Sequence, residues 1–371
     1  MTPAPRRAQR GFTLLELMIA MLVSALLVGM ILSIFTRMSL AYREQQQIAQ
    51  VQQTLAAARS MVERDAKQSG FAMSQGFKMP GDVGFLHSPV VVTNNSTGPD
   101  QVAFFYGDPS VQAAVTATAS WPSSQVTVDD GSAFTPNLLV VMATPDVTTN
   151  ANPISASEAK LAFFDACILQ VGSVAGNVIT FAAAAPWGGV SHCSTPSPNL
   201  TMLYKFVARA YRVDPTRVGD GMLQVSPTGN LQNNTNDWQD LGYGFTDIQV
   251  ATQYFENGDA TDTADPDTDP QRDWYSDGVQ ATRATKVAVG TNFIPPLQMS
   301  ISLVARTDRD IEGLATAFTP SLTVSGNSTN NIIGDHAAVN LGTTSDATLT
   351  GNRIFRYSTF RVDFRNMGVG R

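Results

Sequence analysis

The sequence predicts an α+β fold, in which a long N-terminal helix precedes a large antiparallel β-rich domain. Three observations support this prediction. Residues 12–35 contain a single charged residue, Glu16, and are long enough to span a bilayer as a helix, which takes about 20 residues. Residues 36–69 contain neither Pro nor Gly and are rich in helix-forming residues. After residue 70, short runs of alternating apolar and polar residues are separated by turn residues.

The apolar run follows a short basic leader. Residues 1–11 contain Arg6, Arg7 and Arg10 and no acid, a pattern that holds this end in the cytoplasm and sends the rest of the chain across the membrane. A secretory signal would have a shorter apolar core followed by small residues. A carboxylate inside a membrane span costs about 2.5–3.5 kcal/mol, so Glu16 is a candidate functional residue. The alternative is an ordinary anchor with a chance acid.

The second half of the predicted helix is amphipathic. One continuous helix over residues 12–69 would have 58 residues and a length of about 87 Å. Gly70 is a suitable C-terminal cap. The amphipathic half carries one apolar stripe along the helix. This stripe is too short to favour a free coiled coil, so we expect it to pack on a folded domain. Its apolar residues recur at spacings of three and four: Ile48, Val51, Leu55, Ala58 and Val62.

The rest of the chain is predicted to form antiparallel strands. Alternation is clearest in residues 248–254, 297–305 and 360–364, which indicates one buried and one solvated face. Ala175-Gly176-Asn177 predicts a hairpin turn. Repeated strand–helix units are missing, which disfavours a doubly wound parallel sheet. Further strand-like runs cover residues 101–106, 125–128, 138–142, 168–171, 178–181 and 202–213.

Composition and motifs argue against two classes of function. The formal charge is −7, and removal of the three leader arginines would make it −10 (−7 − 3), which disfavours direct nucleic-acid binding. The sequence lacks a nucleophile elbow, a zinc-protease motif and a phosphate-binding loop. Its three histidines, His87, His192 and His336, are scattered through turn-rich sequence. We therefore predict that the protein is not an enzyme.

The start of the chain resembles a known processing site. Gly11-Phe12-Thr13-Leu14-Leu15-Glu16 is similar to the prepilin-peptidase site of type IV pilins and of type II secretion pseudopilins. The resemblance implies cleavage between Gly11 and Phe12, methylation of the new N-terminal Phe12, and an assembly role for Glu16. In an apolar setting, the Glu16 carboxylate could neutralise the terminal ammonium of a neighbouring chain and so fix the axial register between subunits.

The order of later segments resembles PilW-type minor pilins. That resemblance rests on residues 248–254, 259–277, 297–306 and 355–366 and implies a pilin domain behind the helix. The predicted organisation is a leader (residues 1–11), a transmembrane half-helix (12–35), an amphipathic half-helix (36–70) and a periplasmic or extracellular β-rich domain (71–371).

The resemblance also implies a function and partners. The expected function is that of a minor pilin in type IV pilus assembly, in an initiation or tip complex that serves twitching motility and cell adhesion. The implied partners are other minor pilins, the major pilin, prepilin peptidase, the inner-membrane assembly platform and a tip adhesin. The chain would sit in the bacterial inner membrane and then on the cell surface. Two alternatives stay open: a pseudopilin at the tip of a type II secretion pseudopilus, and a binding module at the pilus tip.

Cys167 and Cys193 are the only cysteines. In the periplasm such thiols are expected to form a disulfide. The closed loop of about 27 residues would stabilise the domain by roughly 3–4 kcal/mol on the chain-entropy model. A metal or redox thiol pair is the alternative. His192 is the neighbour that suggests zinc, but the sequence shows no second Cys/His cluster to complete four ligands.

An acidic segment over residues 256–277 raises the question of calcium binding. Asp265, Asp267 and Asp269 are spaced like the first three ligands of a calcium loop. Pro270 stands where an EF-hand has glycine, and no glutamate occupies position 12. The alternative is a solvated acidic loop. Apart from this calcium site, no cofactor is predicted.

Overall fold

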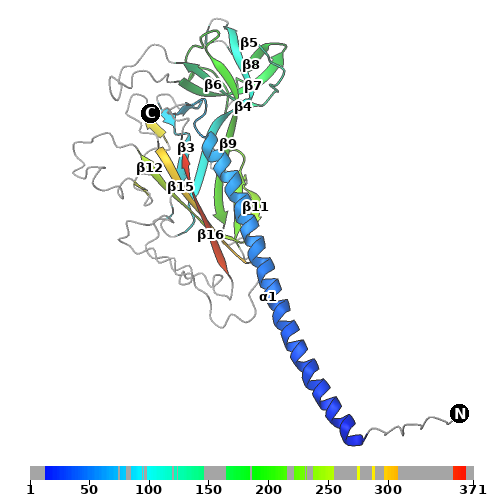
Figure 1. Ribbon diagram of the computed structural model, residues 1–371. Coiled ribbons are helices and arrows are strands. Elements are labelled where there is room, and N and C mark those ends of the chain that lie inside the picture. Colours follow the sequence, from blue (N-terminus) through cyan, green and yellow to red (C-terminus); the bar gives the residue numbers. More distant parts are fainter. Residues whose placement is uncertain are drawn as a thin grey trace, which may run out of the picture.

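The computed structural model shows one long helix joined to a β domain (Figure 1). It describes residues 13–73, 76–80, 85–93, 95, 98–118, 121–122, 124–145, 164–183, 186–214, 221–229, 231, 237–254, 274–275, 286–288, 296–307 and 354–364.

The predicted helix is observed as α1 (Leu14–Gln68), and both of its ends have a physical cause. Thr13 is the N-cap, and its side chain accepts a hydrogen bond from the Glu16 backbone nitrogen. At the other end Ser69 leaves the helical conformation, and Gly70 follows with φ of 78°, in the left-handed region that glycine adopts readily. The Gly70 backbone nitrogen then donates to the Phe105 carbonyl, which ties the helix end to the β domain.

The strands form two sheets. The larger has the order β11-β10-β9-β4-β5-β8-β7-β1-β2-β14, with β3 paired to β4, and β6 paired to both β7 and β9. The smaller has the order β13-β12-β15-β16. Among the described strands, pairing is antiparallel except between β1 and β7. The strands of the larger sheet are β1 (Phe77–Lys78), β2 (Phe85–His87), β3 (Val90–Thr93), β4 (Gln101–Thr118), β5 (Gln125–Val128), β6 (Leu139–Pro145), β7 (Phe164–Ala175), β8 (Val178–Phe181), β9 (Met202–Asp214), β10 (Met222–Ser226), β11 (Gln239–Tyr243) and β14 (Lys286–Ala288). Those of the smaller sheet are β12 (Phe245–Tyr254), β13 (Trp274–Tyr275), β15 (Pro296–Arg306) and β16 (Phe355–Asp363).

Six strands of the larger sheet close into a barrel. The pairings run β4–β5–β8–β7–β6–β9 and return to β4, so within this ring each strand has two partners. Because side chains alternate along a strand, every second residue of these strands points into the barrel. The buried side chains that form this core are Ala113, Val115, Val126, Val128, Phe134, Val140, Met142, Cys167, Leu169, Val171, Ile179, Phe181, Val190, Cys193 and Leu203.

Strand β4 belongs to both the barrel and the region that carries the helix. Its register against β9 shifts between Asp108 and Gln112. Pro109 lies in that shift, where its missing N–H removes no ladder hydrogen bond. Before the shift, Val102 and Phe104 belong to the core that also contains the helix, whereas Ala103 and Phe105 face a separate core cluster on the other side of the strand. After the shift, Ala113 and Val115 line the barrel.

The second half of α1 packs against β15 and β16 of the smaller sheet (Figure 1). Of the predicted stripe residues, Val51, Leu55, Ala58 and Val62 are buried there, and Ile48 is half-buried. They share one core with side chains from both sheets, including Phe104 of the larger sheet. The Arg59 guanidinium lies over the Phe360 ring at 5.4 Å from its centroid. The helix therefore joins the two sheets.

Gly244 marks the point where the chain passes from one sheet to the other. It has φ of 78° and lies between β11 and β12. Its nitrogen donates to Gly221, and its carbonyl accepts from the Arg306 nitrogen at 2.8 Å. A Cβ at this position would lie 2.9 Å from the Arg306 carbonyl oxygen, so both the conformation and the close approach require glycine.

Candidate functional site: the apolar helix and its junction with the β domain

The first turn of α1 holds the one charged residue of the apolar segment. Glu16 Oε2 accepts hydrogen bonds from the Thr13 backbone nitrogen and from Thr13 Oγ1, each at 3.1 Å. Thr13 Oγ1 in turn accepts from the Glu16 nitrogen at 3.3 Å, which completes a capping box. The carboxylate also lies at the positive end of the helix dipole. In the single chain, Glu16 is thus held by its own N-terminal turn.

The processing residues expected from the sequence, Gly11 and Phe12, lie outside the described residues. Thr13 follows them directly, so the capping box places the Glu16 carboxylate next to the position where cleavage would create a new terminus.

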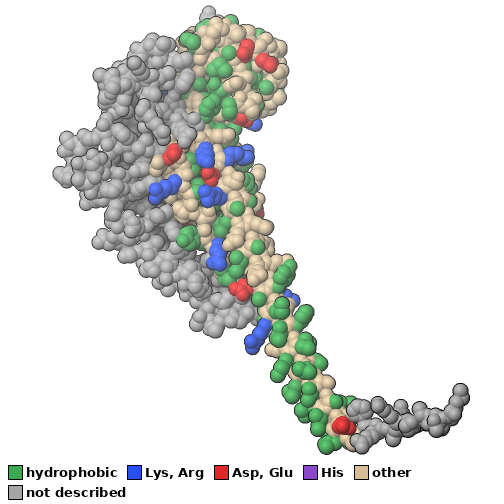
Figure 2. Space-filling model, viewed as in Figure 1, with side chains coloured by type: hydrophobic (Ala, Val, Ile, Leu, Met, Phe, Trp, Pro, Cys, Tyr) green, Lys and Arg blue, Asp and Glu red, His purple; other side chains and the backbone are tan. Residues whose placement is uncertain are grey.

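The first half of α1 has no protein partner among the described residues. Every side chain from residue 14 to residue 35 is exposed. Within the described chain, one helix, α1, is long enough and apolar enough to cross a membrane. Figure 2 shows apolar side chains gathered along the part of the helix that projects from the β domain. Such a surface needs a lipid or protein environment to cover it.

The junction between helix and β domain contains a buried carboxylate. Asp65 lies on the buried stripe of α1 and is 1% exposed. Its Oδ1 accepts a hydrogen bond from the Tyr106 hydroxyl at 3.0 Å, and its Oδ2 accepts from the Tyr211 hydroxyl at 2.5 Å. Tyr106 comes from β4 and Tyr211 from β9, so one helical side chain holds two neighbouring strands.

The surroundings of Asp65 explain why an acid is tolerated there. A buried carboxylate is costly unless it is paired and hydrogen-bonded. The two phenols supply two charge-assisted hydrogen bonds, and Arg64 Nε lies 3.4 Å from Oδ1. Asp65 also lies in the last turn of α1, at the negative end of the helix dipole, which disfavours an acid. The hydrogen bonds to Tyr106 of β4 and Tyr211 of β9 must offset both the burial of the carboxylate and its unfavourable place in the helix dipole. The junction is therefore specific, because only this placement of the helix gives the carboxylate these partners.

The two phenols are strongly perturbed. Burial raises the pKa of Tyr211 well above its ordinary value, and the neighbouring Asp65 charge and hydrogen bond raise it further. The pKa of Tyr106 is raised by the same causes in the same order. Both phenols therefore stay protonated as donors to Asp65 across the physiological range.

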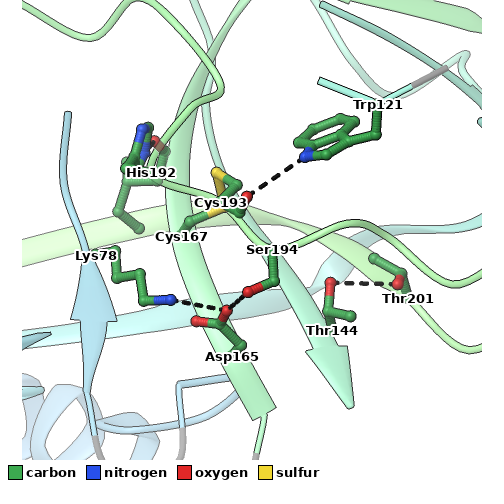
Figure 3. Close-up of a disulfide and its surroundings, with 10 residues drawn as sticks. Lys78, Trp121, Thr144, Asp165, Cys167, His192, Cys193, Ser194 and Thr201 are labelled. Carbon is green, nitrogen blue, oxygen red and sulfur yellow. Dashed lines mark hydrogen bonds and ion pairs between the residues drawn. A yellow bond between two sulfur atoms is a disulfide. The ribbon is translucent and has the colours of Figure 1, made fainter. Parts of the chain in front are cut away.

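Cys167 of β7 and Cys193 of the segment after β8 form a disulfide in the structure, with an S–S distance of 2.04 Å. Lys78 Nζ lies 2.9 Å from Asp165 Oδ2, and the Ser194 hydroxyl donates to the same oxygen (Figure 3). Trp121 Nε1 donates to the Cys193 carbonyl at 3.4 Å. The segment is therefore held by side chains as well as by the covalent bond.

The calcium candidates and the histidines differ in whether the structure describes them. Asp265, Asp267 and Asp269 lie outside the described residues, as does His336, so the calcium site stays a prediction. His192 is half-buried, and its Nε2 lies 3.0 Å from the Ile168 carbonyl oxygen. His87 stacks on Phe77, with ring centroids 5.4 Å apart.

Asp65 is the residue that sequence reasoning missed. It stands three positions after Val62, where the stripe spacing of three and four continues, so its place on the buried face was available from the sequence. The signal was an acid at an apolar position. Its partners could not be inferred, because Tyr106 and Tyr211 are 41 and 146 positions away.

The N-terminal segment matches a known family model. Residues 6–32 match the family model described as "Prokaryotic N-terminal methylation motif". The chain carries a prokaryotic N-terminal methylation motif. The match includes the basic residues, Gly11, Phe12 and Glu16, and it covers 27 of the 371 residues (32 − 6 + 1).

Comparison with solved structures and curated proteins adds less. A type IV-like pilin from Thermus thermophilus matches with 11% sequence identity and a TM-score of 0.34, over 86% of this chain and 99% of that chain. Comparison with curated proteins gives no match.

Proposed function

We propose that this protein is a minor pilin of the PilW type that takes part in type IV pilus assembly. The observation that carries the proposal is the methylation motif of residues 6–32, which continues into a fully exposed apolar helix. Prepilin peptidase would cleave between Gly11 and Phe12 and methylate Phe12. The helix would anchor the chain in the inner membrane, with the β domain in the periplasm, and would then pack among other pilin helices.

Glu16 supplies the assembly contact in this proposal. Before assembly, its carboxylate caps its own helix through Thr13. In the filament it would pair with the Phe12 ammonium of a neighbouring subunit, because both charges are costly in an apolar environment unless they are paired. Glu16 would thus exchange Thr13 of its own chain for the Phe12 ammonium of a neighbouring subunit. This exchange would couple the extraction of the subunit from the membrane to its correct axial register in the filament.

The rest of the molecule supports a structural role without chemistry of its own. Asp65 and the apolar stripe join the helix to two sheets, so a subunit held by its helix presents its β domain in a defined orientation. The apolar half of the helix contains Gly29 and no proline, which favours an unbroken helix and a minor rather than a major subunit. The proposed partners are the other minor pilins, the major pilin and the assembly platform, in an initiation or tip complex.

Deletion of the gene and complementation test this function. We expect the deletion strain to lose surface filaments while its major-pilin level stays unchanged, and the intact gene to restore them. Filaments are counted by electron microscopy, and major pilin is measured by immunoblot. Normal filament number in the deletion strain would contradict the proposal. Normal filaments together with lost protein secretion would favour the pseudopilin function, which the same motif permits.

A further inference from the structure

Two cysteines and a histidine meet where β7 contacts the segment that follows β8. One ligand atom each from Cys167, His192 and Cys193 forms a group in which all atoms lie within 4.8 Å of one another. Both cysteines are buried and His192 is half-buried. Figure 3 labels the three residues. The sulfurs are bonded to each other in this state, so the group offers metal ligands only after the disulfide is reduced.

These ligand types and positions suit a zinc ion. Zinc binds cysteine sulfur at about 2.3 Å and histidine nitrogen at about 2.0–2.1 Å, so a tetrahedral site places neighbouring ligand atoms about 3.5–3.8 Å apart. The histidine nitrogen therefore needs to move by only about 1 Å, and the two sulfurs must separate once their bond is broken. Three protein ligands leave one coordination position open.

The scaffold around the group does not depend on the disulfide alone. Cys193 nitrogen donates to the Val190 carbonyl at 3.1 Å and closes a turn that contains His192. Ser194 and Lys78 both bind Asp165, two residues before Cys167 on β7. The contact of the His192 ring with the Ile168 carbonyl is of the kind that orients metal-binding histidines. None of these contacts involves the sulfur atoms, so breaking the S–S bond removes none of them directly.

We propose that the reduced form of the chain binds one zinc ion through Cys167, Cys193 and His192. A dithiol reductant breaks the S–S bond by donating two electrons and two protons, and it becomes a disulfide itself. Zinc then binds both sulfurs as thiolates and releases the two thiol protons to solvent. The zinc site and the disulfide use the same sulfurs and exclude each other. In an oxidising compartment, bound zinc therefore protects the reduced chain from closure of the disulfide.

Cobalt spectroscopy tests the site in the full-length chain. The protein in detergent is reduced with a dithiol, freed of reductant under argon and titrated with Co²⁺, whose thiolate complexes absorb in the near ultraviolet. We expect a thiolate-to-cobalt band that saturates at one ion per chain and that Zn²⁺ abolishes. His192→Ala should weaken the affinity at least about tenfold, whereas His87→Ala, at a histidine outside the group, should leave it unchanged.

A second readout measures protection from oxidation. A small-molecule disulfide should close Cys167–Cys193 at least about tenfold more slowly when Zn²⁺ is present, and His192→Ala should remove most of that effect. Failure to observe the thiolate-to-cobalt band would overturn the proposal, as would equal affinity in His192→Ala and the unsubstituted chain. Far-UV circular dichroism must show that the reduced chain keeps its strands, because a chain that unfolds on reduction has no such site.

Discussion

At the scale of single residues, Asp65 is a buried acid with two defined hydrogen-bond partners. It is an acid on the buried face of α1, near the end of the helix that disfavours negative charge. Its two tyrosine partners belong to adjacent strands of the larger sheet. A buried polar group with defined partners fixes one arrangement, whereas apolar side chains tolerate small shifts. Asp65 therefore ties the last turn of α1 to β4 and β9.

Asp65→Ala should destabilise the β domain by roughly 2–4 kcal/mol, because two buried hydroxyls lose their acceptor. Tyr211→Phe should cost about 1.5–3 kcal/mol, the value of a hydrogen bond to a charged group. Urea unfolding followed by tryptophan fluorescence measures both. Asp130→Asn is the matched control, since Asp130 is exposed and should change stability little. Equal stability of Asp65→Ala and this control would show that the junction is not specific.

The same residues predict a loss of stability at alkaline pH. The pKa of Tyr106 and of Tyr211 is higher in the folded state than in the unfolded state, where tyrosine titrates near pH 10. Above about pH 10 the unfolded state therefore binds fewer protons than the folded state, and the free energy of unfolding falls as pH rises. Unfolding measured from pH 8 to pH 11 should show this fall, with a shallower slope in Tyr211→Phe. An unchanged slope in that variant would contradict the assignment.

At the scale of elements, α1 is one helix with two environments. Residues 14–35 are exposed throughout, whereas the stripe from Val51 onward is buried against the β domain. Most helical stability in the second half comes from this burial rather than from intrinsic propensity. Among the residues that the structure describes, the first half has no such support, and its apolar surface needs lipid or protein to cover it.

Leu55→Ala should lower the free energy of unfolding of the β domain by roughly 2–5 kcal/mol, as expected for a large buried side chain in a packed core. Leu27→Ala, on the same helix but exposed, should leave that unfolding transition unchanged. Urea unfolding of the detergent-solubilised chain measures the two variants side by side. If they lose stability equally, the stripe does not pack as described.

The elements also show which features can be read from a sequence. The helix and the strands β12 and β15 were predicted because their apolar spacing is local. Strand β4 was expected over residues 101–106 and extends to residue 118, because the shift at Pro109 lets the strand continue where the local sequence suggests a turn. The barrel and the Asp65 contacts join residues far apart in the chain. Only the folded structure shows them.

At the scale of the whole molecule, some parts of the candidate site were predicted from the sequence and others were not. The methylation motif was recognised from six adjacent residues, and the comparison with known families supports it. The pairing of Cys167 with Cys193 followed from the expected compartment and is present in the structure. The packing of the apolar stripe on the β domain was predicted, whereas the hydrogen bonds of Asp65 to Tyr106 and Tyr211 join residues far apart in the chain and were not foreseen. The tip role, the PilW type and the calcium site stay predictions.

Filament incorporation of Glu16→Ala tests the proposed subunit contact. We expect the variant to insert into the membrane as well as the unsubstituted chain, because removal of an acid lowers the cost of insertion. Its presence in sheared surface filaments should fall at least about tenfold, because the neighbouring ammonium would then be buried without a partner. Glu44→Ala, at an acid outside the apolar half, is the control. Normal incorporation of Glu16→Ala, measured by immunoblot of both fractions, would remove Glu16 from the mechanism.

The mass of the N-terminal peptide tests whether the chain is a processed pilin subunit. The protein is isolated from a membrane fraction of cells with and without prepilin peptidase and digested for mass spectrometry. With the peptidase, we expect an N-terminal peptide that begins at Phe12 and in which a methyl group replaces one amine hydrogen, a mass gain of one CH2 unit. Without the peptidase, the leader of residues 1–11 should remain. A chain that keeps Arg10 and Gly11 in cells with active peptidase would contradict the account.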